Sequence, residues 1–154
     1  MRLSNRFKEW YKSRGVSKSG PRILAVSLPL EAIFFLERIG GSQDWAVQFA
    51  DFPSQALRLA SQNEYDVILC DCNQKGHAWR EVMDGLALRS PRSCILLVSP
   101  VKDDHVWLDV LQHHGFDILV RPLQESLTIS TIEAAVRFIN QSNQDATCAS
   151  LPVR

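Results

Sequence analysis

Short apolar runs alternate with segments of helical periodicity along most of this chain. The runs are rich in β-branched and aliphatic residues and are apolar throughout, which is typical of strands that are buried on both faces of a sheet. We expect five such strands, at Ile23–Val26, Trp45–Ala50, Val67–Cys70, Cys94–Val98 and Ile118–Val120.

Between these runs the apolar residues recur at helical spacing, which predicts a helix after each strand. The first helix should begin at Pro29, with Ser27 as a candidate cap, and should end at Gly40-Gly41. The second should begin at Asp51 or Ser54. The expected inner faces of the five helices are, in chain order, Ala32, Phe35, Leu36 and Ile39; Ala56, Leu59 and Ala60; Trp79, Val82, Met83 and Leu86; Trp107, Val110 and Leu111; and Ile129, Ile132, Val136 and Ile139.

Five βα units in a row predict an α/β fold with a doubly wound, five-stranded parallel sheet, because right-handed crossovers place helices on both faces. In such sheets a ligand binds beyond the carboxyl ends of the strands, where the strand order reverses. The residues that follow the strands are therefore the candidates for a site, and they are Ser27-Leu28, Asp71, Ser99-Pro100 and Arg121-Pro122.

Length and composition suit one globular domain with a real core. The chain has 154 residues, of which 45% are hydrophobic and 22% charged. No apolar stretch approaches the roughly 20 residues that span a bilayer, and the N-terminus lacks the apolar segment of a secretory signal, so we expect a cytoplasmic protein. We divide the chain into a basic arm and linker (1–20), the domain (21–140) and a polar tail (141–154).

The formal net charge of zero conceals an uneven distribution. Residues 1–22 carry seven basic side chains against the single acid Glu9, so the rest of the chain is acidic by the same amount. Four apolar residues of this arm share one face of a short helix, and its other face is basic. We expect the arm to fold onto the domain or a partner protein, with an anionic membrane or nucleic acid as the less favoured alternative. The four apolar residues are Leu3, Phe7, Trp10 and Tyr11.

The cysteines and histidines favour structural roles. Cys70, Cys72, Cys94 and Cys148 lack the spacing of a disulfide framework, and a Cys-x-Cys pair with His77 nearby lacks a recognisable fourth metal ligand. The fourth helix should open at Asp103-Asp104 and stop at Gly115, which places His113-His114 at its C-terminal end, where the helix dipole favours imidazolium.

Three segments together resemble the receiver domains of two-component response regulators, over roughly residues 21–140. They are "YDVILCD", which matches the strand that delivers the phosphoacceptor aspartate, "CILLVS", which ends in the switch hydroxyl, and "GFDILVRPL", which ends in a basic residue and proline. The resemblance implies the (βα)5 flavodoxin-like receiver fold.

Position by position, the resemblance makes Asp71 the phosphoacceptor and Ser99 the hydroxyl that would contact a phosphoryl group. Pro122 matches a proline that follows a cis peptide bond. Asn73 stands where the family offers a backbone carbonyl to Mg²⁺. The residues themselves leave alternatives open, because Asp71 could be a turn residue, Ser99 could cap the fourth helix and Arg121 could be a solvated surface residue.

Four positions depart from the family's pattern. The acidic pair that binds Mg²⁺ is replaced by Ser27-Leu28, the lysine after the fifth strand by Arg121, and the aromatic switch residue by Ile118. Phosphoryl transfer to a carboxylate brings negative charges together, and carboxylate-bound Mg²⁺ normally neutralises them. The chain therefore keeps the nucleophile but loses the metal ligands, and we expect no bound cofactor.

We therefore expect a stand-alone receiver-like signalling module that acts through protein–protein contacts and independently of phosphate. Its partners would be a histidine kinase, another response regulator or a downstream effector, and it could form a homodimer. It would have no enzymatic activity beyond residual autophosphorylation on Asp71. The alternatives are a conventional receiver that uses Mg²⁺ and is phosphorylated on Asp71, and a flavodoxin-like small-molecule binder, which the lack of a Gly-rich loop after the first strand disfavours.

Without the metal, Asp71 would need another cation. We expect Arg121 to bind its carboxylate through two hydrogen bonds and Ser99 to donate a third, which would hold the domain in a single state.

Overall fold

The computed structural model describes residues 20–74 and 76–149, with side chains to residue 143. The basic arm and residues 150–154 lie outside the described residues. The strands and helices are, in order, β1 (Arg22–Val26), α2 (Leu30–Gln43), β2 (Ala46–Ala50), α3 (Pro53–Gln62), β3 (Val67–Asp71), α4 (Trp79–Arg89), β4 (Cys94–Ser99), α5 (Asp104–Gln112), β5 (Gly115–Val120) and α6 (Glu125–Ala149).

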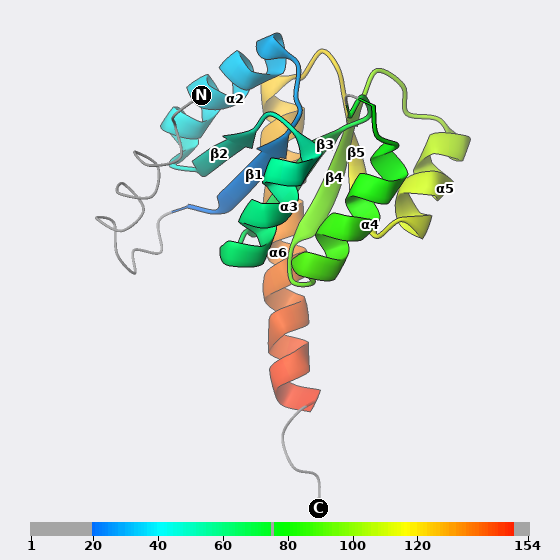
Figure 1. Cartoon of the computed structure of the whole chain (residues 1–154). Coiled ribbons are helices and arrows are strands. Elements are labelled where there is room, and N and C mark those ends of the chain that lie inside the picture. Colours follow the sequence, from blue (N-terminus) through cyan, green and yellow to red (C-terminus); the bar gives the residue numbers. More distant parts are fainter. Residues whose placement is uncertain (1–19, 75, 150–154) are drawn as a thin grey trace, which may run out of the picture.

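The five strands form one parallel sheet in the order β2-β1-β3-β4-β5, which confirms the predicted α/β, doubly wound architecture (Figure 1). The chain moves from β1 to β2 on one side and returns to β3 on the other. The point where strand order reverses therefore lies between the carboxyl ends of β1 and β3, which is where such sheets bind ligands.

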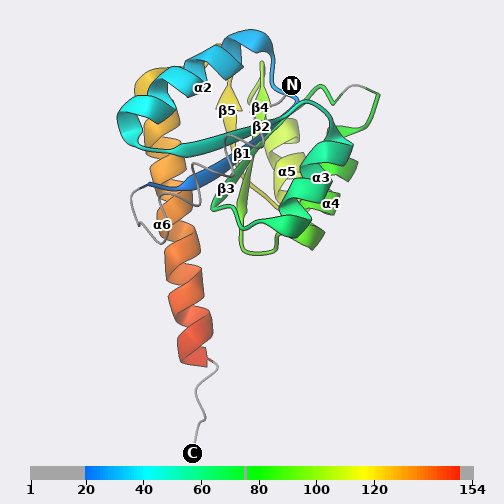
Figure 2. The same cartoon turned by 60° about the vertical axis from the view of Figure 1, so that its left-hand side comes forward.

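Two hydrophobic cores cover the two faces of the sheet. Helices α2 and α6 pack on one face, and α3, α4 and α5 pack on the other (Figure 2). Neighbouring residues of a strand point to opposite faces, so Ile23 and Ala25 lie in the first core while Leu24 and Val26 lie in the second. Both cores exclude water, which explains why the strands are largely apolar. The buried Gln48 of β2 is an exception, and it accepts from the Tyr65 hydroxyl at 2.6 Å.

Several helix boundaries differ from those predicted. Helix α2 continues through Gly40-Gly41 to Gln43 and ends at Asp44, whose φ of 60° is left-handed. A Cβ at position 40 would lie 3.1 Å from the Val47 side chain, so Gly40 serves close packing against β2 rather than helix termination. Ser27 does not cap α2, because its hydroxyl donates to the Asp51 carbonyl at 3.2 Å.

Helix α3 begins at Pro53, with Phe52 at the cap position, and not at Asp51 or Ser54. Proline suits this first position because it has no N–H to leave unpaired and its φ is already helical. Helix α5 ends at Gln112, and the left-handed residue after it is His114, so Gly115 begins β5 instead of stopping the helix.

Helix α6 continues past residue 140 to Ala149, and its C-terminal half projects beyond the body of the domain (Figure 1). The predicted boundary at residue 140 is therefore not marked by a break in secondary structure. None of the helices in the described part of the chain is both long enough and apolar enough to cross a membrane.

Candidate functional site

Asp71 is the last residue of β3 and lies buried at the carboxyl edge of the sheet. Its side chain is only 3% exposed. The backbone N–H of Asn73 donates to Oδ2 at 2.9 Å, and Nε of Arg121 lies 3.3 Å from Oδ1. Burial raises the pKa of Asp71, and the hydrogen bond from Asn73 and the charge of Arg121 offset only part of this effect.

Arg121 contacts Asp71 differently from the prediction. The distance from Nε to Oδ1 is that of an ion pair, yet neither atom makes a hydrogen bond within the described part of the chain, because the N–H does not point at the oxygen. The Nη2 atom donates instead to Cys72 Sγ at 3.8 Å. The expected pair of hydrogen bonds to the carboxylate is therefore wrong, although the two charges do meet. Arg121 is also not a solvated surface residue, since its side chain is 23% exposed.

Ser99 lies at the end of β4 but does not join Asp71. Its Oγ accepts from the backbone N–H of Val101 at 3.2 Å, and it makes no hydrogen bond to Asp71 in the described part of the chain. Its backbone carbonyl accepts from the N–H of Arg121 at 2.9 Å, which positions Arg121 indirectly. The alternative role as a helix cap is also wrong, because Asp103 caps α5 by accepting from Val106 N–H at 2.9 Å.

The turn after β5 has the expected geometry, since the peptide bond between Arg121 and Pro122 is cis. Ile118, at the position of the family's aromatic switch residue, is 3% exposed and lies in the core beneath α4 and α5. It is packed in the interior instead of standing at the surface.

Sequence reasoning missed Gln74, which is part of this site. It lies three residues beyond Asp71 in the loop between β3 and α4, where a polar residue is ordinarily solvated, but it is 1% exposed. Its Nε2 donates to the carbonyl oxygen of Asp71 at 2.6 Å and to that of Val26 at 3.4 Å. The amide thus lies at the point where strand order reverses. No periodicity identifies such a residue, because its burial depends on how the loop turns.

Comparison with known proteins finds no matching family model and no match among curated proteins. Solved structures do match. A two-component response regulator from Clostridium difficile superposes with a TM-score of 0.71 at 18% identity, covering 78% of this chain and 98% of that one. A CheY-like response regulator receiver domain protein from Methanospirillum hungatei gives 0.73 at 14% identity, covering 80% and 99%. A structure titled adenylate cyclase from Rhodopirellula baltica gives 0.77 at 21% identity, covering 86% and 99%.

This chain has the receiver-domain fold. In that fold a metal would be expected beside Asp71, and the residues present can be compared with what a hard dication requires. Magnesium needs several oxygen ligands, usually including carboxylates. Ser27 turns its hydroxyl to Asp51, and Leu28 is packed in the core. The described residues contain no group of three or more metal-ligating side chains.

The backbone carbonyls of Val26 and Asp71, at the ends of β1 and β3, accept from the N–H₂ of Gln74 and are therefore already engaged. The site therefore does not fit Mg²⁺, and no chemical step can be derived through a metal.

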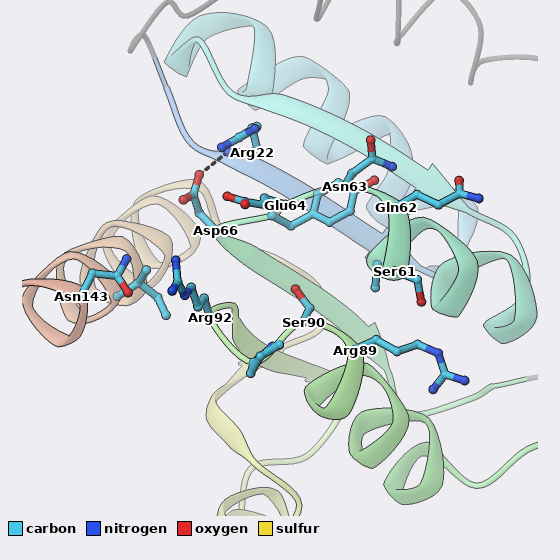
Figure 3. Close-up of a pocket in the computed structure, with 14 residues that line it drawn as sticks. Arg22, Ser61, Gln62, Asn63, Glu64, Asp66, Arg89, Ser90, Arg92 and Asn143 are labelled. Carbon is cyan, nitrogen blue, oxygen red and sulfur yellow. Dashed lines mark hydrogen bonds between the residues drawn. The ribbon is translucent and has the colours of Figure 1, made fainter. Parts of the chain in front are cut away.

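A second candidate region lies at the opposite edge of the sheet. A pocket of about 460 Å³ opens where α6 leaves the body, and Arg22, Asp66, Arg92 and Asn143 are among the residues that line it (Figure 3). Asp66 accepts from the backbone N–H of Arg22 at 2.8 Å. Residues at or just before the amino-terminal ends of β1 and β3 line this pocket, so it is separate from Asp71, which lies at the carboxyl end of β3.

The three cysteines whose side chains the structure describes are fully or partly packed in the interior. Cys70 and Cys94 are buried, and burial raises the pKa of both thiols, that of Cys94 to about 12. Cys72 is half-buried against Arg121. The side chain of Cys148 lies outside the described residues.

The histidines and tryptophans make structural contacts. His113 lies with Nδ1 3.0 Å from an Asp84 carboxylate oxygen, and Trp79 meets its ring edge-on. Trp79 and Trp107 pack against the core beneath α3, α4 and α5.

Proposed function

We propose that this chain is a receiver-like module of two-component signalling that works through protein–protein contacts and without phosphorylation. The observation that carries this proposal is the environment of Asp71. The nearest cation is Arg121, and the end of β1 contributes no carboxylate, since Ser27 and Leu28 stand there and are engaged elsewhere. A phosphoryl group arriving at Asp71 would meet negative charge with little to neutralise it.

The partners would be proteins that read the surface of the fold: a histidine kinase, another response regulator or a downstream effector. Support comes from the edge strand β5 and the helices that flank it. Large apolar side chains remain exposed on all three elements, which is typical of a protein-binding surface. They are Leu108 and Leu111 on α5, Val120 on β5, and Leu127 and Phe138 on α6.

The test is incubation with a small phosphodonor and Mg²⁺, followed by intact mass measurement. We expect no stable adduct, because the metal ligands are missing. A conventional receiver domain incubated alongside reports that the phosphodonor is active. A gain of one phosphoryl group that disappears in Asp71→Asn would contradict the proposal.

That outcome would favour a conventional receiver phosphorylated on Asp71. One observation favours this second function: Asp71 and Ser99 lie at the ends of the adjacent strands β3 and β4.

A further inference from the structure

The loop between β3 and α4 brings a buried amide to the centre of the candidate site. Gln74 is held there by the turn that follows it. The N–H of His77 donates to the Gln74 carbonyl at 3.2 Å, and Gly76 adopts a φ of 89°, which a residue with a side chain reaches only with strain. The chain therefore reverses direction just beyond Gln74, which leaves its side chain directed inward.

The orientation of the amide follows from its neighbours. The carbonyl oxygens of Val26 and Asp71 lie 3.4 Å and 2.6 Å from Nε2. Rotating the amide by half a turn would set its own oxygen against both carbonyls, which repels. Two converging oxygen atoms thus require an electropositive group, and an uncharged N–H₂ supplies it.

We propose that the Gln74 side chain, whose amide nitrogen joins the ends of β1 and β3, fills the space beside Asp71 and excludes divalent ions from it. This inference rests on the proposed phosphate-independent function, and it explains why the site would not hold the metal that phosphorylation requires. The amide satisfies two carbonyls but adds no positive charge, so among the described residues the Asp71 carboxylate is paired with the single cation Arg121 and accepts one hydrogen bond, from the Asn73 N–H.

Replacing Gln74 by glutamate tests the proposal most directly, because the side chain keeps its length while the donating nitrogen becomes an anionic oxygen. Gln74→Glu sets a carboxylate against two carbonyls and beside Asp71. We expect it to melt roughly 4–8 °C below the wild type in EDTA, and millimolar Mn²⁺ to restore at least half of that loss by binding the folded state.

The wild type should melt at the same temperature with and without Mn²⁺. Gln62→Glu is the matched control, because it makes the same substitution at an exposed position at the other edge of the sheet. It should neither lower the melting temperature by more than about 1 °C nor create a response to Mn²⁺.

Three outcomes would overturn the proposal. They are stabilisation of the wild type by Mn²⁺, a Gln74→Glu protein that melts like the wild type, and a Gln74→Glu protein that remains destabilised or unfolded with Mn²⁺ present.

Gln74→Met keeps the length and removes the donor without adding charge. It should lower the melting temperature with no response to Mn²⁺, and wild-type melting would count against the role of the amide. Phosphorylation of the wild type would refute the proposed function, but it would not change how these variants respond to Mn²⁺ in the absence of phosphodonor.

Discussion

The carboxyl group of Asp71 has two oxygen atoms in different surroundings. Oδ2 accepts a backbone hydrogen bond, whereas Oδ1 is buried with only the misaligned Arg121 Nε beside it. A buried carboxylate is costly unless it is paired and hydrogen-bonded, and this one is only partly so. Arg121 therefore reduces the cost of burying Asp71 without removing it.

A double-mutant cycle with Asp71→Ala and Arg121→Ala measures that contribution. We expect each single substitution to lower the free energy of unfolding by roughly 1–3 kcal/mol, because each leaves the opposite charge buried and unpaired. The double variant should lose less than the sum of the two. The measurement is urea unfolding of all four proteins, and strictly additive losses would mean that the two side chains do not interact.

At this site the sequence predicts only those features that depend on which residue follows each strand. Asp71 and Arg121 follow β3 and β5, the two strands that flank β4 in the sheet, so their meeting could be predicted, but the direction of the Arg121 N–H groups could not. Ser99 lies at the predicted position at the end of β4, but its hydroxyl oxygen accepts from the Val101 N–H in the loop that follows. Gln74 was missed because the left-handed turn at Gly76, rather than any local pattern, buries it.

Among the secondary-structure elements, the strands follow from the apolar runs and the helix ends do not. A run such as Val67–Cys70 can be buried on both faces only as a central strand, which β3 confirms. Glycine is ambiguous by contrast, because it permits a left-handed turn and also a close approach of two elements. Gly40 and Gly115 both serve the second purpose, so both predicted helix ends were wrong.

The contact between α5 and β5 yields a prediction at this scale. A Cβ at position 115 would lie 2.2 Å from Val110 Cγ1, 2.8 Å from Met83 Cε and 2.9 Å from the Val110 carbonyl oxygen. Gly115→Ala must therefore displace α5, and we expect it to lower the free energy of unfolding by roughly 1–3 kcal/mol.

Gly41→Ala is the control for this variant. A Cβ at position 41 meets no heavy atom within 4 Å, and the residue lies inside α2. Alanine favours a helix interior over glycine, so this variant should be more stable than the wild type by up to about 1 kcal/mol. If chemical denaturation shows Gly115→Ala to be as stable as the wild type, the described packing of α5 against β5 is incorrect.

For the molecule as a whole, the two edges of the sheet differ in chemistry. The carboxyl edge holds a buried carboxylate paired with one guanidinium, and an amide that donates to the Asp71 backbone carbonyl. The amino edge holds an open polar pocket beside the projecting helix α6. The proposed phosphate-independent module would need a stable carboxyl edge more than a reactive one, and the contacts of Gln74 and Arg121 contribute to that stability.

The pH dependence of the free energy of unfolding tests whether burial or the charge of Arg121 has the larger effect on the pKa of Asp71. Burial raises the pKa of Asp71 above its ordinary value of 3.8. The folded state then holds this proton more tightly than the unfolded state, so the wild type loses stability as the pH rises from 3.8 through the raised pKa. Asp71→Asn does not titrate, so its stability should improve relative to the wild type across that interval and level off above it.

The stability of Asp109→Asn relative to the wild type should depend on pH in the opposite way. The hydrogen bond from Arg80 lowers the pKa of Asp109, so the wild type should lose stability relative to this variant as the pH falls below 3.8. The measurement is urea unfolding of the three proteins at a series of pH values. If Arg121 dominated instead, the pKa of Asp71 would be lowered, and Asp71→Asn would lose stability relative to the wild type as the pH rises. The direction of that difference therefore decides whether the candidate site is a neutralised ion pair or a carboxyl group kept partly uncompensated by its burial.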